Sequence, residues 1–309
     1  MDRQPANARF TNDLLDRTKR AATLVKLTKE ARMSAAIVDG EPGARSPDGA
    51  ARLEFSRRGA VTELGRLFQQ GSLRVLRPNA PAGEPACAVL LNTSGGDVLQ
   101  IEGCLAPDAA AMITTQGAEK VYRSAGALST VDVRLALGAD TWLEWLRQDT
   151  ILFDRARLRR RLVPDLAASA RLLAADLLVF GRRARRAVPQ RPVPRPLGSS
   201  LCRPAGVGGR LLADGPGALL DPPFGFAGAG AAATAIYVAP DAADRLEFAR
   251  ALIDRSDVRS GATCLAPVLI LRWLGEDPVC VRHALQQFCA RFRHVVAGLP
   301  ERVPVIWRT

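Results

Sequence analysis

The sequence predicts a mainly β protein with a few α-helices, and three observations support this. Short runs such as Val131–Leu137 alternate apolar and polar residues, as half-buried strands do. The run Ala86–Leu91 is continuously apolar, which is typical of a strand that is buried on both faces. Clusters of Gly, Asn and Asp separate these runs and favour turns, while two segments near the C-terminus show helical periodicity instead.

Length and composition are those of a globular protein. The 309 residues suffice for one large domain or two small ones, and 48% are apolar against 24% charged. No apolar run approaches the roughly 20 residues that span a membrane, and MDRQPANARF has no apolar segment after its charges. The six cysteines include no C-x-x-C pair and indicate neither a zinc finger nor a disulfide framework. We therefore expect a cytoplasmic protein without a membrane contact.

Residues 1–50 are expected to be an N-terminal helix and a flexible linker that precede the main domain at 51–309. Asn12–Ala36 has apolar residues at helical spacing, whereas Gly40–Gly49 is polar and rich in Gly and Pro. The helix is either a docking element for a partner or a loosely held tail.

Strands are expected from Ala51 to Val75, with a turn at Arg57–Gly59, and the run Leu73–Pro78 should expose one face. The buried strand at 86–91 ends in the turn Asn92–Asp97. Such a Gly-Gly-Asp turn either closes a tight hairpin or presents the Asp carboxylate to a metal. It is not a phosphate-binding Walker loop, because the G-K-[ST] ending is missing.

The middle of the chain continues the strand pattern. Val131–Leu137 and Trp142–Leu146 alternate on either side of a turn at Gly138–Asp140. The basic segment Ala156–Arg161 is expected to be exposed. The Ala and Leu content of Leu162–Phe180 favours a helix.

Residues 182–217 fit no regular element and are expected to be a disordered insert rich in Arg, Pro and Gly. They contain eight arginines and one acidic residue, so much of the net charge of +12 is concentrated there. This basic cluster leaves open a nucleic-acid-binding protein. The segment has no aromatic residue to stack on a base, so nucleic acid is the weaker interpretation.

The C-terminal part is expected to contain a strand at 231–238, a helix capped by Asp241 that runs through Asp254, and a second helix over Pro278–Val296. The apolar segment between the two helices is broken by Pro267. Both histidines of the chain fall on the second helix, off its apolar stripe and eleven residues apart. This spacing excludes a zinc pair at i and i+4.

The chain contains no G-x-S-x-G, H-E-x-x-H or C-x-x-C motif. A strand-rich protein without these motifs is more typical of a scaffold or assembly factor than of an enzyme. We therefore expect no catalytic residues.

Several segments resemble the urease accessory protein D family (UreD, also called UreH). In chain order they read LEFSRRGAVTEL, QQGSLRVLRP, NTSGGD, MITTQGAEKVYRSAG, WLEWLRQDTILFDRARL, LLVFGR and ATAIYVAPDA, and the likeness covers about 51–181 and 218–309. The resemblance implies a flattened, β-helix-like stack of strands with a few α-helices. It therefore favours strands over a helix at Leu162–Phe180.

The resemblance also implies a function. Proteins of this family are urease maturation factors that bind apo-urease and UreF, which recruits the GTPase UreG with its nickel. Such a metallochaperone scaffold holds no tightly bound cofactor, and nickel is only in transit. Asp97 is a candidate nickel contact or a turn residue, and Cys104 is a candidate nickel contact or a simply buried thiol. Residues of the family signature, with partner-binding or structural roles, are Gly95, Gly96, Thr114, Thr115, Gln116, Lys120, Tyr122 and Arg123.

Two departures from the family pattern stand out. The Gly-Gly-Asp loop is shorter than the family's, and residues 182–217 lose the family character before it resumes near Leu219. A pair of compensating frameshifts in the gene would produce such a segment. A degenerate, inactive relative is therefore an alternative to an active maturation factor.

Overall fold

The structure is a computed structural model that describes residues 47–93, 98–123, 128–153, 156–181, 226–254 and 258–308, and the backbone of 198–201 and 209–211. The expected N-terminal helix lies outside the described residues, as do Gly95, Gly96 and Asp97. All described residues belong to one unit, Pro47–Thr309. None of the helices in the described part of this unit is long and apolar enough to cross a membrane.

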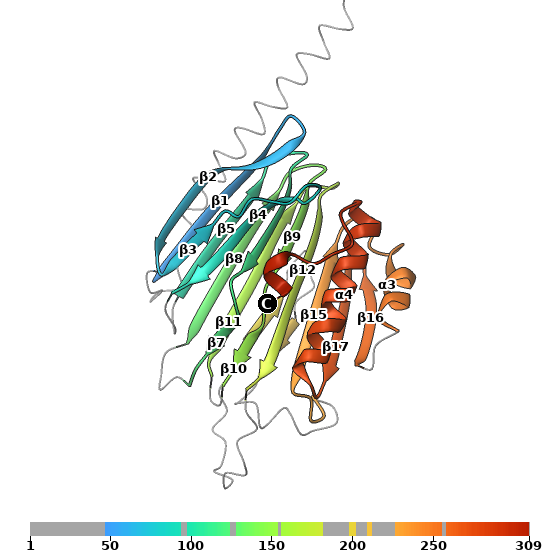
Figure 1. Ribbon diagram of the computed structural model, residues 1–309. Coiled ribbons are helices and arrows are strands. Elements are labelled where there is room, and N and C mark those ends of the chain that lie inside the picture. The colour runs from blue at the N-terminus through green and yellow to red at the C-terminus, as the bar shows by residue number, and fades with distance from the viewer. Residues whose placement is uncertain are drawn as a thin grey trace, which may run out of the picture. The chain divides into compact units, whose positions relative to one another are not determined.

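One sheet has seven strands, most of which run parallel to their neighbours (Figure 1). A hairpin at one edge and a short hairpin at the other supply the antiparallel pairs. In spatial order the strands are β14 (Gly209–Leu211), β13 (Gly198–Leu201), β11 (Leu158–Leu166), β8 (Ser129–Leu137), β5 (Val98–Leu105), β1 (Gly49–Arg58) and β2 (Val61–Gly71).

The second sheet has ten strands and is mixed. Its main path is β16 (Arg259–Leu265), β17 (Val268–Gly275), β15 (Ala231–Val238), β12 (Arg171–Phe180), β9 (Trp142–Leu146), β6 (Ala110–Thr115), β4 (Ala86–Asn92) and β3 (Leu73–Leu76). Two short strands lie off this path, where β10 (Thr150–Leu152) pairs with β12 and β7 (Glu119–Val121) pairs with β10.

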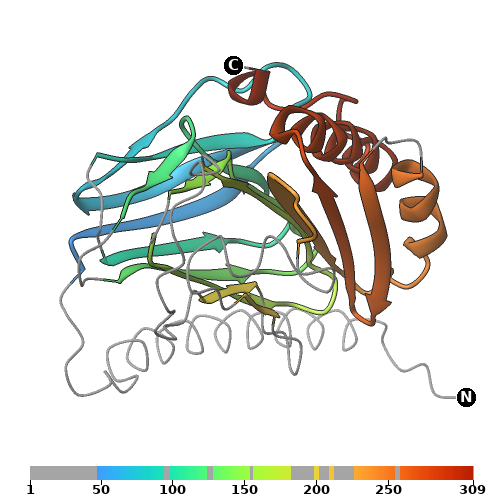
Figure 2. The same cartoon turned by 90° about the horizontal axis from the view of Figure 1, so that it is seen from below.

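The chain passes back and forth between the two sheets. From β4 it goes to β5, then to β6, β8, β9, β11, β12 and β13, and each strand from β6 onward pairs in parallel with the strand one turn earlier in the same sheet. The result is a flattened helical stack whose two layers are visible in Figure 2. This arrangement confirms the expected mainly β, β-helix-like fold.

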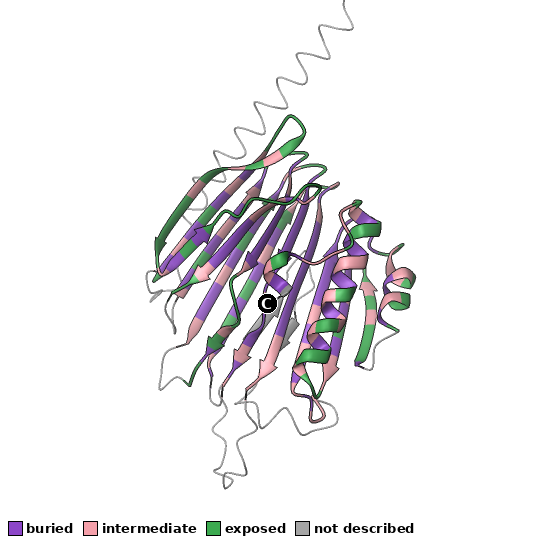
Figure 3. Ribbon diagram, in the orientation of Figure 1, coloured by how far each residue is buried: buried purple, intermediate pink, exposed green. Residues whose placement is uncertain are grey.

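Two apolar cores hold the layers together. The first lies between the two sheets and includes Leu53, Phe55 and Ile113. The second lies between the ten-stranded sheet and the helices α3 (Leu246–Ile253) and α4 (Pro278–Ala297), and includes Trp273 and Phe288. Figure 3 shows the buried residues running along the central strands, with exposed residues on β2 and on the outer side of α4. The short 3-10 helix η1 (Val305–Arg308) follows α4.

In strand β9, an alternating sequence pattern does not mean that one face is exposed. Its five residues are all buried, because one face meets the inter-sheet core and the other meets α4. Leu162–Phe180 also forms strands rather than a helix, as the family resemblance indicated, and successive residues of β12 alternate between the two cores, with Ala174 in the first and Ala175 in the second. Helical propensity is a weak preference that tertiary packing overrides.

Three sequence expectations need correction. The helix expected to begin at Asp241 begins at Leu246, and the Asp241 carboxylate instead accepts hydrogen bonds from the Tyr237 hydroxyl and from Arg245 Nε, both at 2.8 Å. The segment 182–217, expected to lack regular elements, contributes the strands β13 and β14. Arg160, expected to be exposed within a basic segment, is buried because its strand turns this side chain toward the interior.

The second C-terminal helix is confirmed. Pro278 occupies its first turn, and the carboxylate of Asp277 accepts a hydrogen bond from Val279 N. His283 and His294 are exposed, as their place off the apolar stripe predicted.

Candidate functional site

Five polar side chains interrupt the apolar core between the two sheets. Each lies two residues from an apolar core residue, four of them within strands and Arg147 directly after β9, and points to the same, inner side. Arg160, for example, lies between the core residues Leu158 and Leu162 of β11. We call this set the interior charged cluster, and its members are Glu119, Arg147, Thr150, Arg160 and Asp176.

Arg160 connects the two sheets within this cluster. Its Nη1 donates to Asp176 Oδ2 at 2.6 Å, and its Nη2 donates to Glu119 Oε2 at 2.8 Å and to Thr150 Oγ1 at 3.0 Å. Arg147 Nη2 donates to the same oxygen of Glu119. The guanidinium of Arg160 therefore lies among three oxygens that come from three different strands.

Burial and charge oppose each other at Glu119. Burial disfavours its charged form, but the guanidiniums of Arg147 and Arg160 outweigh that effect and lower the pKa of Glu119 below its usual value. Asp176 Oδ1 and the Nε atoms of both arginines are also buried, and none has a hydrogen-bond partner among the described residues. Buried polar atoms of this kind are the usual binding places of internal water.

Protonation of Glu119 at low pH should lower the stability of the folded protein. A carboxyl whose folded-state pKa is lowered contributes stability above its unfolded pKa of about 4.3, and this contribution is lost as the pH falls through the folded pKa. We therefore expect urea unfolding midpoints to fall between about pH 5 and about pH 3. The Glu119→Gln variant should show a shallower fall over that range. Equal slopes in the two proteins would contradict this assignment.

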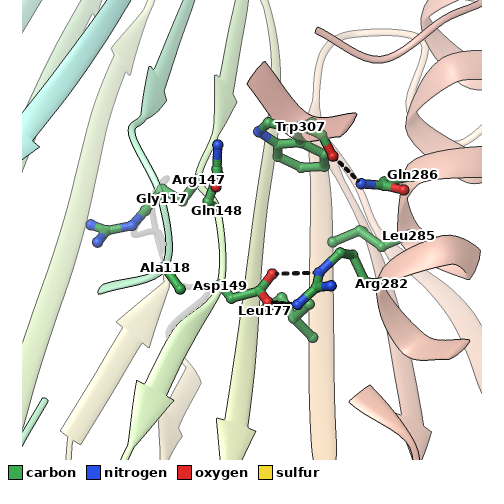
Figure 4. A pocket seen from close by; sticks show the side chains of 10 residues that line it. All are labelled: Gly117, Ala118, Arg147, Gln148, Asp149, Leu177, Arg282, Leu285, Gln286 and Trp307. Atoms are coloured by element: carbon green, nitrogen blue, oxygen red, sulfur yellow. Dashed lines mark hydrogen bonds and ion pairs between the residues drawn. The ribbon is translucent and has the colours of Figure 1, made fainter. Parts of the chain in front are cut away.

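A small pocket adjoins the cluster on the side of α4. Its volume is about 150 Å³, and it is lined by Gly117, Ala118, Arg147, Gln148, Asp149, Leu177, Arg282, Leu285, Gln286 and Trp307. Figure 4 shows the Asp149 carboxylate facing Arg282 across this pocket, and Arg282 Nε donates to Asp149 Oδ1 at 3.0 Å. Arg147 belongs to both features, because it lines the pocket and binds Glu119 in the cluster.

Trp307 of the C-terminal segment lines the pocket. Figure 4 shows Gln286 Nε2 donating to Trp307 O, at 2.7 Å. Gln148 Nε2 donates to Ile306 O at 2.6 Å. The indole of Trp307 is buried, and its Nε1 donates to Thr114 Oγ1 at 3.0 Å. Side chains from the sheet and from α4 thus fix η1 in place.

A second buried network ties α4 to the ten-stranded sheet. Arg293 is fully buried, and its Nε and Nη2 donate to the two carboxylate oxygens of Glu144 at 2.7 and 3.0 Å. Nη2 also donates to Glu84 Oε2 at 2.7 Å, and Arg302 Nε donates to the other oxygen of Glu84 at 2.7 Å. We call these four residues the helix-anchoring network.

The expected site residues Thr114, Thr115 and Gln116 differ in burial and in their contacts. Thr114 is buried and accepts the hydrogen bond from Trp307, while Thr115 Oγ1 accepts one from Gln148 N at 3.0 Å. Gln116 is exposed just after β6. These contacts give both threonines structural partners close to the pocket.

The remaining signature residues lie farther along the same segment. Lys120, Tyr122 and Arg123 are exposed, and the ring of Tyr122 stacks on Phe153 with centroids 4.8 Å apart. Their expected partner-binding roles remain predictions.

Cys104 does not face the interior charged cluster. On β5 the residues Ile101, Gly103 and Leu105 are buried, so the half-buried Cys104 points to the opposite, outer side of the seven-stranded sheet. Within the described residues, no group of three or more His, Cys, Asp or Glu side chains is arranged to hold a metal ion. A contact between nickel and Cys104 or Asp97 remains a prediction.

The cluster itself was missed by the sequence reasoning. The segment Ala156–Arg161 was expected to be exposed, yet Ala156, Leu158 and Arg160 are all buried. A signal was present, because Leu158, Arg160 and Leu162 occupy successive positions on one face of a strand. An arginine between two leucines on that face indicates a buried charge that needs a partner.

Comparison with known proteins identifies the family. Residues 47–308 match the family model described as UreD urease accessory protein. The chain belongs to the UreD family. A curated UreD from Xanthobacter autotrophicus is 39% identical over 280 residues, which cover 85% of this chain and 90% of the relative. A UreD from Magnetococcus marinus is 37% identical, with 84% and 93% covered, and one from Azorhizobium caulinodans is 36% identical, with 87% and 98% covered.

Membership of the UreD family supports a role in urease maturation. The matched region includes the whole interior charged cluster and the helix-anchoring network. The relatives are named urease accessory proteins.

Proposed function

We propose that this UreD-family chain is a scaffold that binds apo-urease together with UreF and UreG and helps to deliver nickel to the urease active site. The match to the UreD family over residues 47–308 carries the proposal. On this proposal the chain acts in the cytoplasm, performs no catalysis of its own, and holds nickel only in transit.

The interior charged cluster supports the nickel part of the proposal. Carboxylate oxygens such as those of Glu119 and Asp176 are suitable ligands for divalent metals. A scaffold that passes a metal on must bind it weakly, because a tight closed site would trap the ion. The two arginines of the cluster already neutralise its carboxylates, which keeps the resting affinity for a cation low.

The partner part of the proposal can be tested by co-purification. The tagged full-length chain is mixed with metal-free urease, UreF and UreG, and the retained proteins are identified. We expect metal-free urease and UreF to be retained, and UreG to join only when UreF is present. A folded chain that retains neither urease nor UreF would overturn the scaffold and favour an inactive relative.

A further inference from the structure

The Arg160 guanidinium is surrounded by oxygen atoms of the kinds that also bind metal cations. Glu119 Oε2, Thr150 Oγ1 and Asp176 Oδ2 lie 2.6 to 3.0 Å from its terminal nitrogens. Two of these oxygens belong to carboxylates and the third to a hydroxyl; Thr150 and Asp176 are buried, and the Glu119 side chain is 21% exposed. The same oxygen types surround hard divalent cations in proteins.

A fourth oxygen is available at the same place. Asp176 is 4% exposed, and its Oδ1 is buried without a hydrogen-bond partner among the described residues. Leaving one oxygen of a buried carboxylate unsatisfied is costly for a protein. A metal ion that replaced the guanidinium could bind both oxygens of Asp176, whereas Arg160 uses only one.

We propose that Glu119, Thr150 and Asp176 form a divalent-cation site, and that the guanidinium of Arg160 occupies this site when no cation is bound. A passing cation displaces the guanidinium from these oxygens, and the return of the guanidinium releases the cation. The inference rests on the proposed function, because it describes how nickel in transit is bound without being trapped.

Arg147 is a suitable control residue for Arg160. The two arginine side chains are equally buried, at 6% exposure each, and both bind Glu119 Oε2. Among the described residues, Arg147 donates no hydrogen bond to Asp176 or Thr150, whereas Arg160 contacts all three oxygens. The two residues therefore carry the same charge at the same depth, and only one of them fills the proposed site.

The test compares Arg160→Met with Arg147→Met in the purified full-length chain. Each substitution removes one buried positive charge, and Ni²⁺ binding is measured by equilibrium dialysis. We expect Arg160→Met to retain one additional Ni²⁺ per chain, with an affinity at least about tenfold above that of the wild type. Arg147→Met should bind Ni²⁺ like the wild type. Asp176→Asn in the Arg160→Met background should abolish the additional site.

Folding of the variants is part of the same test. A cation that replaces the guanidinium should also replace its stabilising role, so Ni²⁺ should raise the thermal midpoint of Arg160→Met but not that of Arg147→Met. Arg160→Gln serves as a second variant, because its amide still donates a hydrogen bond. The proposal is overturned if neither Arg160 variant retains extra Ni²⁺ when folded, or if neither folds even with Ni²⁺ present.

The cation site and the maturation role can fail separately in these experiments. Ni²⁺ binding to the purified chain needs no urease, UreF or UreG. A chain that fails to bind these partners can still gain the site in Arg160→Met, and a chain that binds them can still lack it.

Discussion

Replacing Arg293 by Met should lower the free energy of unfolding by about 3–5 kcal/mol, because the buried carboxylate of Glu144 loses its counter-charge and Glu84 keeps only Arg302. Glu144 is fully buried, and both of its oxygens accept from Arg293. The same guanidinium donates to the carbonyl oxygens of Pro300 and Arg302 at 3.1 and 2.9 Å. The substitution therefore weakens the attachment of α4 and of the segment that follows it. Urea unfolding followed by circular dichroism measures the change.

A matched control lies two residues earlier on α4. Arg291 is partly exposed and pairs with Glu301 at 3.5 Å, so Arg291→Met should change the unfolding free energy by less than about 1 kcal/mol. Adding Glu144→Gln to Arg293→Met should recover part of the loss, because the unpaired buried charge is removed. Equal effects of Arg291→Met and Arg293→Met would show that the helix-anchoring network does not stabilise the fold.

Replacing Trp307 by Ala should cost about 3–5 kcal/mol of unfolding free energy, the range for truncating a large buried aromatic side chain. The indole is 6% exposed, packs in the second core, and donates to Thr114 Oγ1. Its loss also removes one of the side chains that line the pocket. We expect the variant to unfold at lower urea concentration, and we expect the side-chain amide protons of Gln148 and Gln286, which donate to η1, to exchange faster with solvent.

Two further variants separate packing from hydrogen bonding at this position. Trp307→Phe keeps a ring but removes the donor to Thr114, and the lost hydrogen bond alone should cost about 1 kcal/mol. Val305→Ala changes a residue that is 65% exposed on the same 3-10 helix, and its effect should be within about 0.5 kcal/mol. A stable Trp307→Ala protein would mean that η1 is not anchored by this side chain.

Local patterns in the sequence predicted much of the fold. The apolar stripe of Val281, Leu285 and Phe288 indicated the helix α4, and Pro278 marked its first turn. The turn at Arg57–Gly59 indicated the hairpin of β1 and β2, where Gly59 has a φ of 60°. These signals act between residues that are close in the chain. The stacking of the strands came from the family resemblance rather than from any local pattern.

The partners of the charged residues in the interior could not be predicted in the same way. Glu144 pairs with a partner 149 residues later, and Glu84 pairs with one 209 residues later. No local pattern connects such positions, so a buried acid inside a strand resembles a solvent-facing one. Asp241 was misplaced for a similar reason, because its bonds to Tyr237 and Arg245 compete with a cap that its sequence context favoured.

The nickel content of urease matured with and without this chain tests its proposed role most directly. The urease structural subunits are co-expressed with UreF, UreG and a nickel supply, and the purified urease is assayed for bound nickel and for activity. We predict nickel-loaded, active urease only when the chain is present. Equal nickel and activity without the chain, or none with it, would contradict its role in delivering nickel to urease.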